Sequence, residues 1–122
     1  MSSESGLEGS DGHWVYCATN GAAYSLTRSW AKELGKYNIR VVACAPGILE
    51  PTGLRSPAYN EALAYTRGCK PNELSTDYNK VIPLGRDGKL DEVGSLVAFL
   101  VSDRAGYITG TTINISGGKS RG

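Results

Sequence analysis

The sequence predicts an α/β fold in which helices cover a parallel β-sheet. Segments with helical periodicity alternate with short β-rich runs, in the order loop, helix, strand, loop, helix, strand. That alternation is typical of a layered architecture built on a parallel sheet. The first β-rich run, residues 39–45, is almost continuously apolar, as expected for a strand buried on both faces. At 122 residues, the chain is expected to form a single domain over 1–122.

Residues 1–14 are rich in serine, glycine and glutamate and are predicted to form a loop. A long helix is predicted over 15–36, because apolar residues recur at every fourth position. Trp30 on this stripe is expected to pack in the core or against a helix, and any part of the stripe that stays exposed could be an interface; the members of the stripe are Ala18, Ala22, Leu26, Trp30 and Leu34. Gly35 and Asn38 supply the signals that end the helix.

The strand at 39–45 is ended by a Pro-Gly pair. Residues 48–83 have little periodicity beyond short helices near 59–66 and 72–80, and so irregular a segment is more often a substrate-binding loop or lid than a connection. A second helix is predicted over 90–102, with Asp91 and Glu92 in its first turn, where the helix dipole favours anions. Residues 111–115 form the final predicted strand. Because two strands alone make a marginal sheet, we expect further strands that precede residue 1.

Composition excludes several classes of partner. The formal net charge is +1 with both signs mixed along the chain, which predicts no nucleic-acid partner. The longest apolar run, residues 93–101, falls short of the roughly 20 residues that span a bilayer, and no signal peptide opens the chain, so no membrane association is expected. Three cysteines without C-x-x-C spacing and one histidine predict no metal site, and an odd cysteine count favours the cytoplasm.

One cluster of residues indicates acid–base chemistry. Tyr16 begins the long helix, Ser3 precedes it by thirteen residues, and Asn20 follows one helical turn later. Residues i and i+4 of a helix share a face, so the side chain at position 20 can reach the same ligand as the Tyr16 phenol. A tyrosine, a preceding serine and a cation one turn later would form a general acid–base site. Here the serine and the tyrosine are present and asparagine stands where the cation is needed.

An ordered set of motifs resembles the C-terminal, catalytic half of the short-chain dehydrogenase/reductase family. The resemblance covers nearly the whole chain, and its motifs are Ser2-Ser3, Tyr16-Cys17-Ala18-Thr19-Asn20, Ala45-Pro46-Gly47, Pro83-Leu84-Gly85-Arg86, Tyr107-Ile108-Thr109-Gly110 and Gly117-Gly118. Within that family, residues 45–50 and 52–55 are most similar to sorbitol-6-phosphate dehydrogenases. The resemblance implies the C-terminal portion of a doubly wound parallel-sheet (Rossmann-like) fold, with the N-terminal half absent from this sequence.

The resemblance also implies an activity, namely reversible hydride transfer between NAD or NADP and a secondary alcohol or ketone. The substrate would be a small molecule, a sugar or polyol phosphate such as sorbitol 6-phosphate. Ser3 would orient the reacting oxygen, Tyr16 would exchange the proton, and Asn20 occupies the position of the family's catalytic lysine. The residues implied to hold the cofactor are Tyr16, Asn20, Pro46, Gly47, Ile48 and Thr52. Family subunits commonly pair through the tyrosine helix, which implies a homo-oligomer or pairing with the missing half.

Asparagine at position 20 predicts weak activity. A phenol must lose about three pKa units to act as a base at neutral pH, worth roughly 4 kcal/mol, and asparagine brings no charge to supply it. The family's glycine-rich phosphate-binding turn would lie in the absent half, and Gly6, Gly9 and Gly12 do not replace it because no strand precedes them. The isolated chain is therefore expected to be weak or inactive. The alternatives are an inactive truncated or degenerate relative that acts as a self-association or interaction module, and a half-protein completed by a separate partner half.

Two further groups of residues have competing interpretations. Ser10, Asp11 and His13 have the residue types of a hydrolase triad, but three neighbours on one short loop rarely converge as a triad must, and a solvated turn is expected. Three cations in the irregular segment are compatible either with contacts to a substrate phosphate or with simple solvation: Arg55, Arg67 and Lys70.

Overall fold

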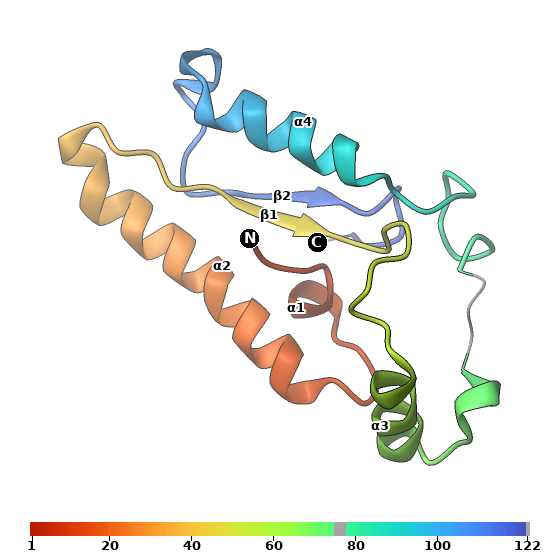
Figure 1. Cartoon of the computed structure of the whole chain (residues 1–122). Coiled ribbons are helices and arrows are strands. Elements are labelled where there is room, and N and C mark those ends of the chain that lie inside the picture. Colours follow the sequence, from red (N-terminus) through yellow and green to blue (C-terminus); the bar gives the residue numbers. More distant parts are fainter. Residues whose placement is uncertain (75–77, 122) are drawn as a thin grey trace.

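The structure is a computed structural model that describes residues 1–74 and 78–121. At its centre lie two parallel strands, β1 (Ala43–Pro46) and β2 (Thr112–Ile115), paired in register from Ala43 opposite Thr112 to Pro46 opposite Ile115. Figure 1 shows these strands between α4 and the helices of the N-terminal half of the chain. The predicted α/β class with a parallel sheet is confirmed.

The N-terminal segment runs parallel to β1 along its other edge. Residues 43 and 47 donate their N–H groups to the carbonyls of Thr111 and Ile115, just before β2 and at its end, so the carbonyls of residues 44 and 46 point the opposite way. There they accept the N–H groups of Ser2 (2.8 Å) and Glu4 (3.0 Å). Pro46 has no N–H to return a hydrogen bond, which leaves the ladder incomplete. β1 is therefore the middle of three adjacent segments, and residues 2–4 are held at its carboxyl end.

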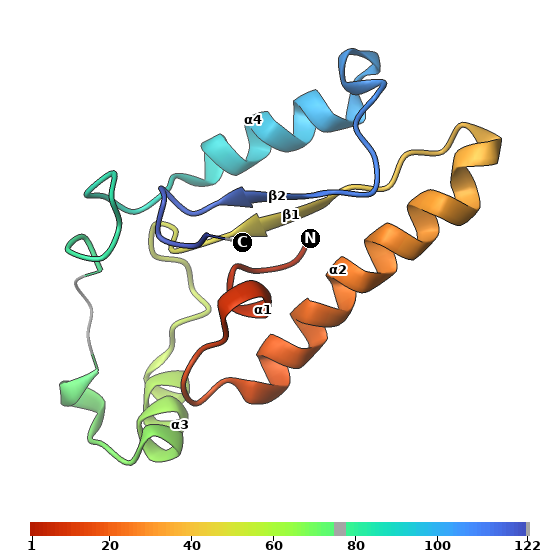
Figure 2. The same cartoon turned by 180° about the vertical axis from the view of Figure 1, so that it is seen from behind.

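Helices cover both faces of the strands. α1 (Ser5–Glu8) and α2 (Trp14–Leu34) lie on one face and α4 (Leu90–Val101) on the other, as Figures 1 and 2 show from opposite sides. Because successive strand residues point to opposite faces, Ala43 and Ala45 pack with Tyr24 of α2, whereas Cys44 packs with Leu100 of α4. The core thus consists of two small clusters separated by β1.

The buried face of α2 differs from the predicted one. Its buried residues are Tyr24, Thr27 and Ala31, whereas Leu26 and Trp30 are 45% and 47% exposed. The expectation that Trp30 packs into the core was therefore wrong. Leu26 and Trp30 thus form part of an apolar surface on α2 that no other described element covers.

The boundaries of several elements also differ from the predictions. The predicted loop 1–14 contains α1, and the strand predicted at 39–45 begins only at residue 43 and extends to 46. The irregular segment contains α3 (Pro57–Arg67), capped by the Ser56 hydroxyl, which accepts the N–H of Tyr59 at 3.2 Å. In place of the helix expected at 72–80, the described residues show only a 3₁₀ helix, Pro71–Glu73, and residues 75–77 lie outside the described part. Two more 3₁₀ helices follow α2 and α4, at Gly35–Tyr37 and Asp103–Ala105.

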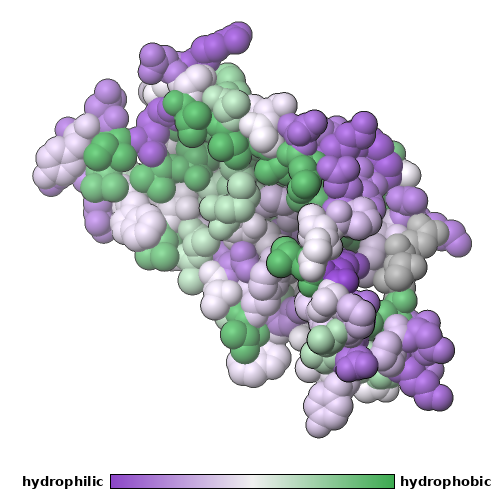
Figure 3. All heavy atoms as spheres, in the orientation of Figure 1, coloured by the Kyte–Doolittle hydropathy of each residue, from purple (hydrophilic) through white to green (hydrophobic). Residues whose placement is uncertain are grey.

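α4 is apolar around most of its circumference. Val93 and Leu100 are buried, while Leu90, Phe99 and Val101 are exposed, and hydrophobic side chains are visible over this helix in Figure 3. After α4 ends, the guanidinium of Arg40 donates to the carbonyl of Ser102 at 3.1 Å and ties the approach to β1 to this layer. Within the described residues no helix is both long and apolar enough to cross a membrane, and all three cysteines are free.

Candidate functional site

The two serines at the N-terminus meet the middle of α2. The Ser2 hydroxyl contacts the backbone oxygen of Asn20 at 2.9 Å and its side-chain Oδ1 at 3.3 Å. The neighbouring Ser3 is buried, accepts the N–H of Ser5 on its hydroxyl, and receives the Tyr24 hydroxyl on its carbonyl oxygen. The structure therefore brings the predicted serine segment and Asn20 together, although the direct contact is made by Ser2.

Tyr16 lies in the first turn of α2 and is half exposed, at 50%. The side chain of Asn20 donates to the backbone oxygen of Tyr16 at 2.9 Å, so the amide is folded back along the helix toward the turn that carries the phenol. The His13 ring lies 6.0 Å from the Tyr16 ring, centroid to centroid. The phenol is thus open to a ligand, and the neutral amide of Asn20 lies one turn away on the same face.

The carboxyl ends of β1 and β2 converge at Gly47. A Cβ added to this residue would lie 2.8 Å from Oε2 of Glu4 and 2.9 Å from the backbone Cα of Ser116. No side chain other than hydrogen fits between these two neighbours. Gly47 therefore lets three segments close together: the one that carries Ser3, the turn after β1, and the turn after β2.

An ion-pair group fastens the C-terminal tail to this junction. The Lys119 ammonium contacts Glu4 at 2.9 Å and also Glu8. Burial raises the pKa of Glu4 above its ordinary value, and the hydrogen bond from Lys119 only partly opposes it. Burial lowers the pKa of Lys119, but the hydrogen bonds to Glu8 and Glu4 together raise it. The second carboxylate oxygen of Glu4, Oε2, is buried without a hydrogen-bond partner among the described residues.

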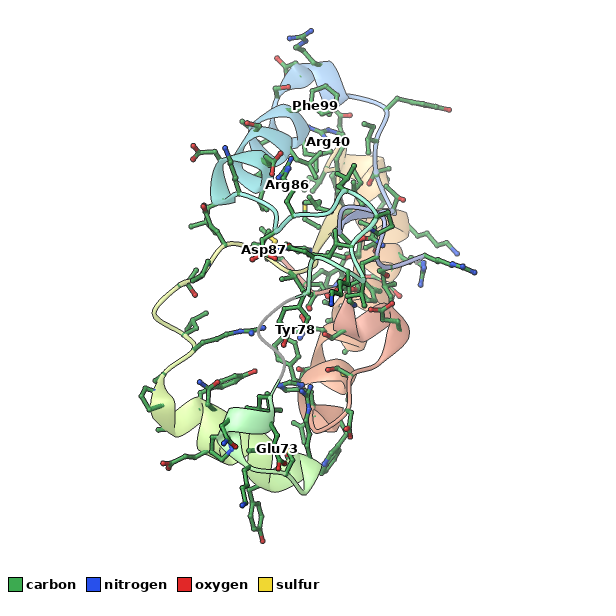
Figure 4. All side chains as sticks on the ribbon, turned by 90° about the vertical axis from the view of Figure 1, so that its right-hand side faces the viewer. Arg40, Glu73, Tyr78, Arg86, Asp87 and Phe99 are labelled. Atoms are coloured by element: carbon green, nitrogen blue, oxygen red, sulfur yellow. The ribbon has the colours of Figure 1, made fainter. Side chains whose placement is uncertain are left out.

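A cavity opens beside the same strand ends. Its wall includes Ile48 and Leu49 after β1 together with Ile115, Ser116 and Gly117 of β2 and its following turn; the other lining residues are Leu84, Arg86, Gly88, Lys89 and Glu92. Two hydrogen bonds with Arg86, of 2.6 and 2.9 Å, hold the pKa of Glu92 at about 2 and keep this exposed ion pair formed. In Figure 4, Arg86 lies on the segment that leads into α4.

The residues implied to hold the nicotinamide end of a cofactor fit that role in part. Ile48 lines the cavity, and Pro46 and Gly47 precede it in the chain at the carboxyl end of β1, where ligands of α/β sheets bind. The Ile48 carbonyl, however, already accepts the N–H of Gly88 at 3.0 Å. Thr52 lies on an exposed turn, and its hydroxyl accepts the Leu54 N–H at 3.4 Å. Of these residues only Ile48 lines the cavity, and Thr52 lies outside it.

His13 is a residue whose surroundings the sequence did not reveal. Its Nδ1 contacts the Ser10 hydroxyl at 3.0 Å and its Nε2 contacts the Tyr59 hydroxyl at 2.9 Å. Residues 11–12 form a turn, as expected, and His13 beside it is partly exposed while its ring contacts two hydroxyls. Ser10, Asp11 and His13 do not form a hydrolase triad, because both ring nitrogens contact hydroxyls and neither contacts a carboxylate. No local signal linked position 13 to position 59, since the contact depends on how α3 folds back.

No group of three or more histidine, cysteine, aspartate or glutamate side chains that could hold a metal occurs among the residues that the structure describes.

Comparisons with known proteins place this geometry in a family. Residues 1–120 match the family model described as enoyl-(acyl carrier protein) reductase. The chain is 62% identical to sorbitol-6-phosphate 2-dehydrogenase of Klebsiella pneumoniae over its whole length, which is 46% of that protein. It is 39% identical to the 3-oxoacyl-[acyl-carrier-protein] reductase FabG of Thermotoga maritima, over 97% of the chain and 43% of the relative. The chain thus spans about half the length of these curated relatives.

Solved structures agree with the sequence comparisons. Levodione reductase superimposes with a TM-score of 0.76 at 31% identity, over 97% of this chain and 44% of that one. The 3-ketoacyl-(acyl-carrier-protein) reductase of Brucella melitensis, solved in complex with NADH, gives a TM-score of 0.74 at 28% identity, over 98% and 42% of the two chains. A short-chain dehydrogenase from Bacillus anthracis gives 0.66 at 32% identity, over 85% of this chain and 36% of that one. The parallel strands, the Ser3 segment beside the Tyr16 helix and the matched family model together establish that the chain belongs to the short-chain dehydrogenase/reductase family.

Proposed function

We propose that the chain forms the substrate-binding and proton-transfer part of a NAD(P)-dependent oxidoreductase. Its substrate would be sorbitol 6-phosphate or a closely similar polyol phosphate, which is interconverted with the corresponding ketose phosphate. The observation that carries this proposal is the 62% identity to a sorbitol-6-phosphate 2-dehydrogenase along the whole chain, against 39% for a reductase of a different substrate class.

The proposed roles follow the positions of the side chains. The Ser3 segment is held at the carboxyl end of β1 and lies beside α2, so its hydroxyl is assigned to orient the substrate oxygen. The half-exposed Tyr16 phenol is assigned to take the hydroxyl proton during oxidation and return it during reduction. A bound nicotinamide would accept the hydride from the substrate carbon that carries this hydroxyl. Gly47 and Ile48 are assigned to the carboxamide end of the nicotinamide.

Reconstitution tests this function. The chain would be co-expressed with the part of the Klebsiella pneumoniae sorbitol-6-phosphate 2-dehydrogenase that it does not cover, and the product is called here the complemented chain. We expect slow but saturable reduction of NAD⁺ or NADP⁺ that depends on sorbitol 6-phosphate and is lost in Tyr16→Phe. The matched control is the relative's own covered part supplied in the same way. A complemented chain that binds cofactor and substrate but shows no Tyr16-dependent turnover would contradict the enzymatic proposal and leave a binding module.

We also infer that α2 pairs with a second copy of the chain. Leu26 and Trp30 leave an apolar surface on this helix exposed, and such surfaces on soluble chains mark interaction sites. Trp30→Glu is expected to shift sedimentation toward the monomer, whereas Trp14→Glu, the same change on the first residue of α2, is expected to leave the assembly intact. A chain that sediments as a monomer before any substitution would disprove the pairing.

A further inference from the structure

Basic side chains gather where α3 meets the start of α2. We name His13, Arg55 and Arg67 the basic cluster. His13 immediately precedes α2, without a capping hydrogen bond from its side chain, and its ring contacts the hydroxyls of Ser10 and Tyr59. Its ring lies 6.0 Å from the ring of Tyr16, the proposed proton carrier. The His13 side of the cluster is therefore adjacent to the proposed reaction centre.

Close packing of α3 holds Arg67 in place. Gly12, at φ +76°, leaves no space for a Cβ, which would lie 2.8 Å from the Thr66 hydroxyl and 3.2 Å from Cγ of Arg67. The Nε of Arg67 donates to the carbonyl of Asp11 at 3.0 Å. That hydrogen bond occupies Nε. The two terminal nitrogens of the guanidinium, Nη1 and Nη2, form no ion pair with any described residue.

Arg55 approaches from the segment between β1 and α3. Its guanidinium lies 5.4 Å from the centre of the Tyr78 ring and reaches the Tyr78 hydroxyl at 3.5 Å. In Figure 4, Tyr78, which Arg55 contacts, is well separated from Arg86, which lines the cavity described above. Arg55 and Arg86 therefore belong to different sites. Like Arg67, Arg55 forms no ion pair with any residue that the structure describes.

The charges of Arg67 and Arg55 both act on the ring of His13. Burial lowers the pKa of His13 below its ordinary value of 6.5, and the charges of Arg67 and then Arg55 lower it further. Asp11 opposes these effects, and its influence is smaller than theirs. The first turn of the 21-residue helix α2 carries no acidic residue that would neutralise its dipole. An anion bound beside His13 would therefore be attracted by the charges of Arg67 and Arg55 and by the N-terminus of α2.

We infer that His13, Arg55 and Arg67 form the subsite for the phosphate group of the polyol phosphate, an inference that rests on the function proposed above. Arginine binds phosphate through paired N–H donors, which suits this ligand to two guanidinium groups that form no ion pair with the described residues. A hexitol phosphate oxidised at C2 carries its phosphate on C6, at the other end of a short polyol chain. The subsite must therefore lie near Tyr16 without touching the reacting carbon, which is the position of the cluster. Lys70, the third cation of this segment, is exposed and contacts Glu73 through its backbone N–H, and it is not included.

His13 is the only histidine in the sequence, so its titration can be followed without ambiguity. We would record the Cε1 proton of His13 by NMR from pH 5 to 8 on the 122-residue chain, alone and with saturating sorbitol 6-phosphate or sorbitol. A phosphate dianion beside the ring favours the imidazolium, so sorbitol 6-phosphate is expected to raise the pKa of His13 by about one unit. Sorbitol at the same concentration is expected to leave it unchanged. Binding should accordingly weaken as the pH rises through that raised pKa.

Substitutions then assign the shift to the cluster. Arg67→Gln and Arg55→Gln are each expected to weaken sorbitol 6-phosphate binding about tenfold, which corresponds to about 1.4 kcal/mol. Arg104→Gln removes the same charge from the 3₁₀ helix after α4 and is the matched control, expected to bind as the unchanged chain does. Arg55 is exposed, so its variant remains informative if Arg67→Gln disturbs folding.

The results separate this inference from the proposed function. A His13 pKa that does not move with sorbitol 6-phosphate, that moves equally with sorbitol, or that moves fully in both arginine variants would overturn the subsite. Turnover of sorbitol 6-phosphate by the complemented chain with an unmoved His13 would uphold the function and refute the subsite. A phosphate-specific shift without turnover would uphold the subsite and refute the function.

Discussion

Replacing Asn20 by lysine is expected to raise the rate of sorbitol 6-phosphate oxidation by the complemented chain on the order of 10² to 10⁴-fold, the usual contribution of a positioned acid–base group. The Asn20 amide donates to the Tyr16 carbonyl and contacts the Ser2 hydroxyl, and it carries no charge. A lysine ammonium on this face of α2 would stabilise the phenolate form of Tyr16 and offer three donors to a bound ribose. The rate would be read from the change in NAD(P)H absorbance at saturating substrate.

The control is Asn20→Met, which has a long side chain similar in reach but no charge. It is expected to stay near the rate of the unsubstituted chain, because shape alone does not stabilise a phenolate. The pH profile adds a second criterion, since the lysine variant should retain activity to lower pH than the asparagine form. Equal rates for asparagine and lysine at position 20, or a gain with methionine as well, would show that charge at this position does not limit catalysis.

Gly47→Ala is expected to lower the free energy of unfolding by about 2 kcal/mol. The added methyl group would lie 2.8 Å from Oε2 of Glu4 and 2.9 Å from the Cα of Ser116, and the latter atom belongs to the backbone of the turn after β2. Relief requires the two strand ends to separate, which strains the pairing of β1 with β2 and the hydrogen bond from Glu4 to Pro46. Urea unfolding would show the loss as a lower midpoint with an unchanged slope.

Gly94→Ala provides the matched control for the same chemical change. Gly94 lies inside α4, and a Cβ there meets nothing within 4 Å. Alanine is a better helix former than glycine, so this variant is expected to gain about 0.5 to 1 kcal/mol. If both glycine variants unfolded at the same urea concentration, the close approach at Gly47 would not contribute to stability.

The long helix shows where the sequence was sufficient and where it was not. Its existence and extent followed from apolar periodicity, and the structure places α2 at Trp14–Leu34 against a prediction of 15–36. The face it buries did not follow. At about 100° per residue, each step of four residues turns a stripe by about 40°, so five residues spaced by four spread over about 160°, nearly half of the helix circumference. Tyr24, Thr27 and Ala31 are spaced by three and then four, stay on one side, and are the residues that are buried.

The candidate site divides in the same way. Ser3, Tyr16, Asn20, Pro46 and Gly47 could be named from the sequence, because their separations along the chain carry the family pattern. The partners of His13 could not, because Tyr59 lies 46 residues away on α3 and no periodic pattern connects the two. The same holds for the Glu4–Lys119 pair, whose members are 115 residues apart. Such contacts depend on how the loops bring distant segments together, and the secondary-structure propensity of neighbouring residues does not predict this.

The sequence by itself determined the α/β class, the parallel order of strands and helices, the family, and the absence of a charged residue one turn after Tyr16. These depend on local propensity, periodicity and motif spacing, which are properties of neighbouring residues. Only the tertiary structure decided that Ser2 rather than Ser3 touches Asn20, that Gly47 is closed in by Glu4 and Ser116, and that the basic cluster lies beside Tyr16. These contacts depend on which distant segments come together in the folded chain. Here β1 packs closely with its two neighbours, and α3 packs closely with the start of α2.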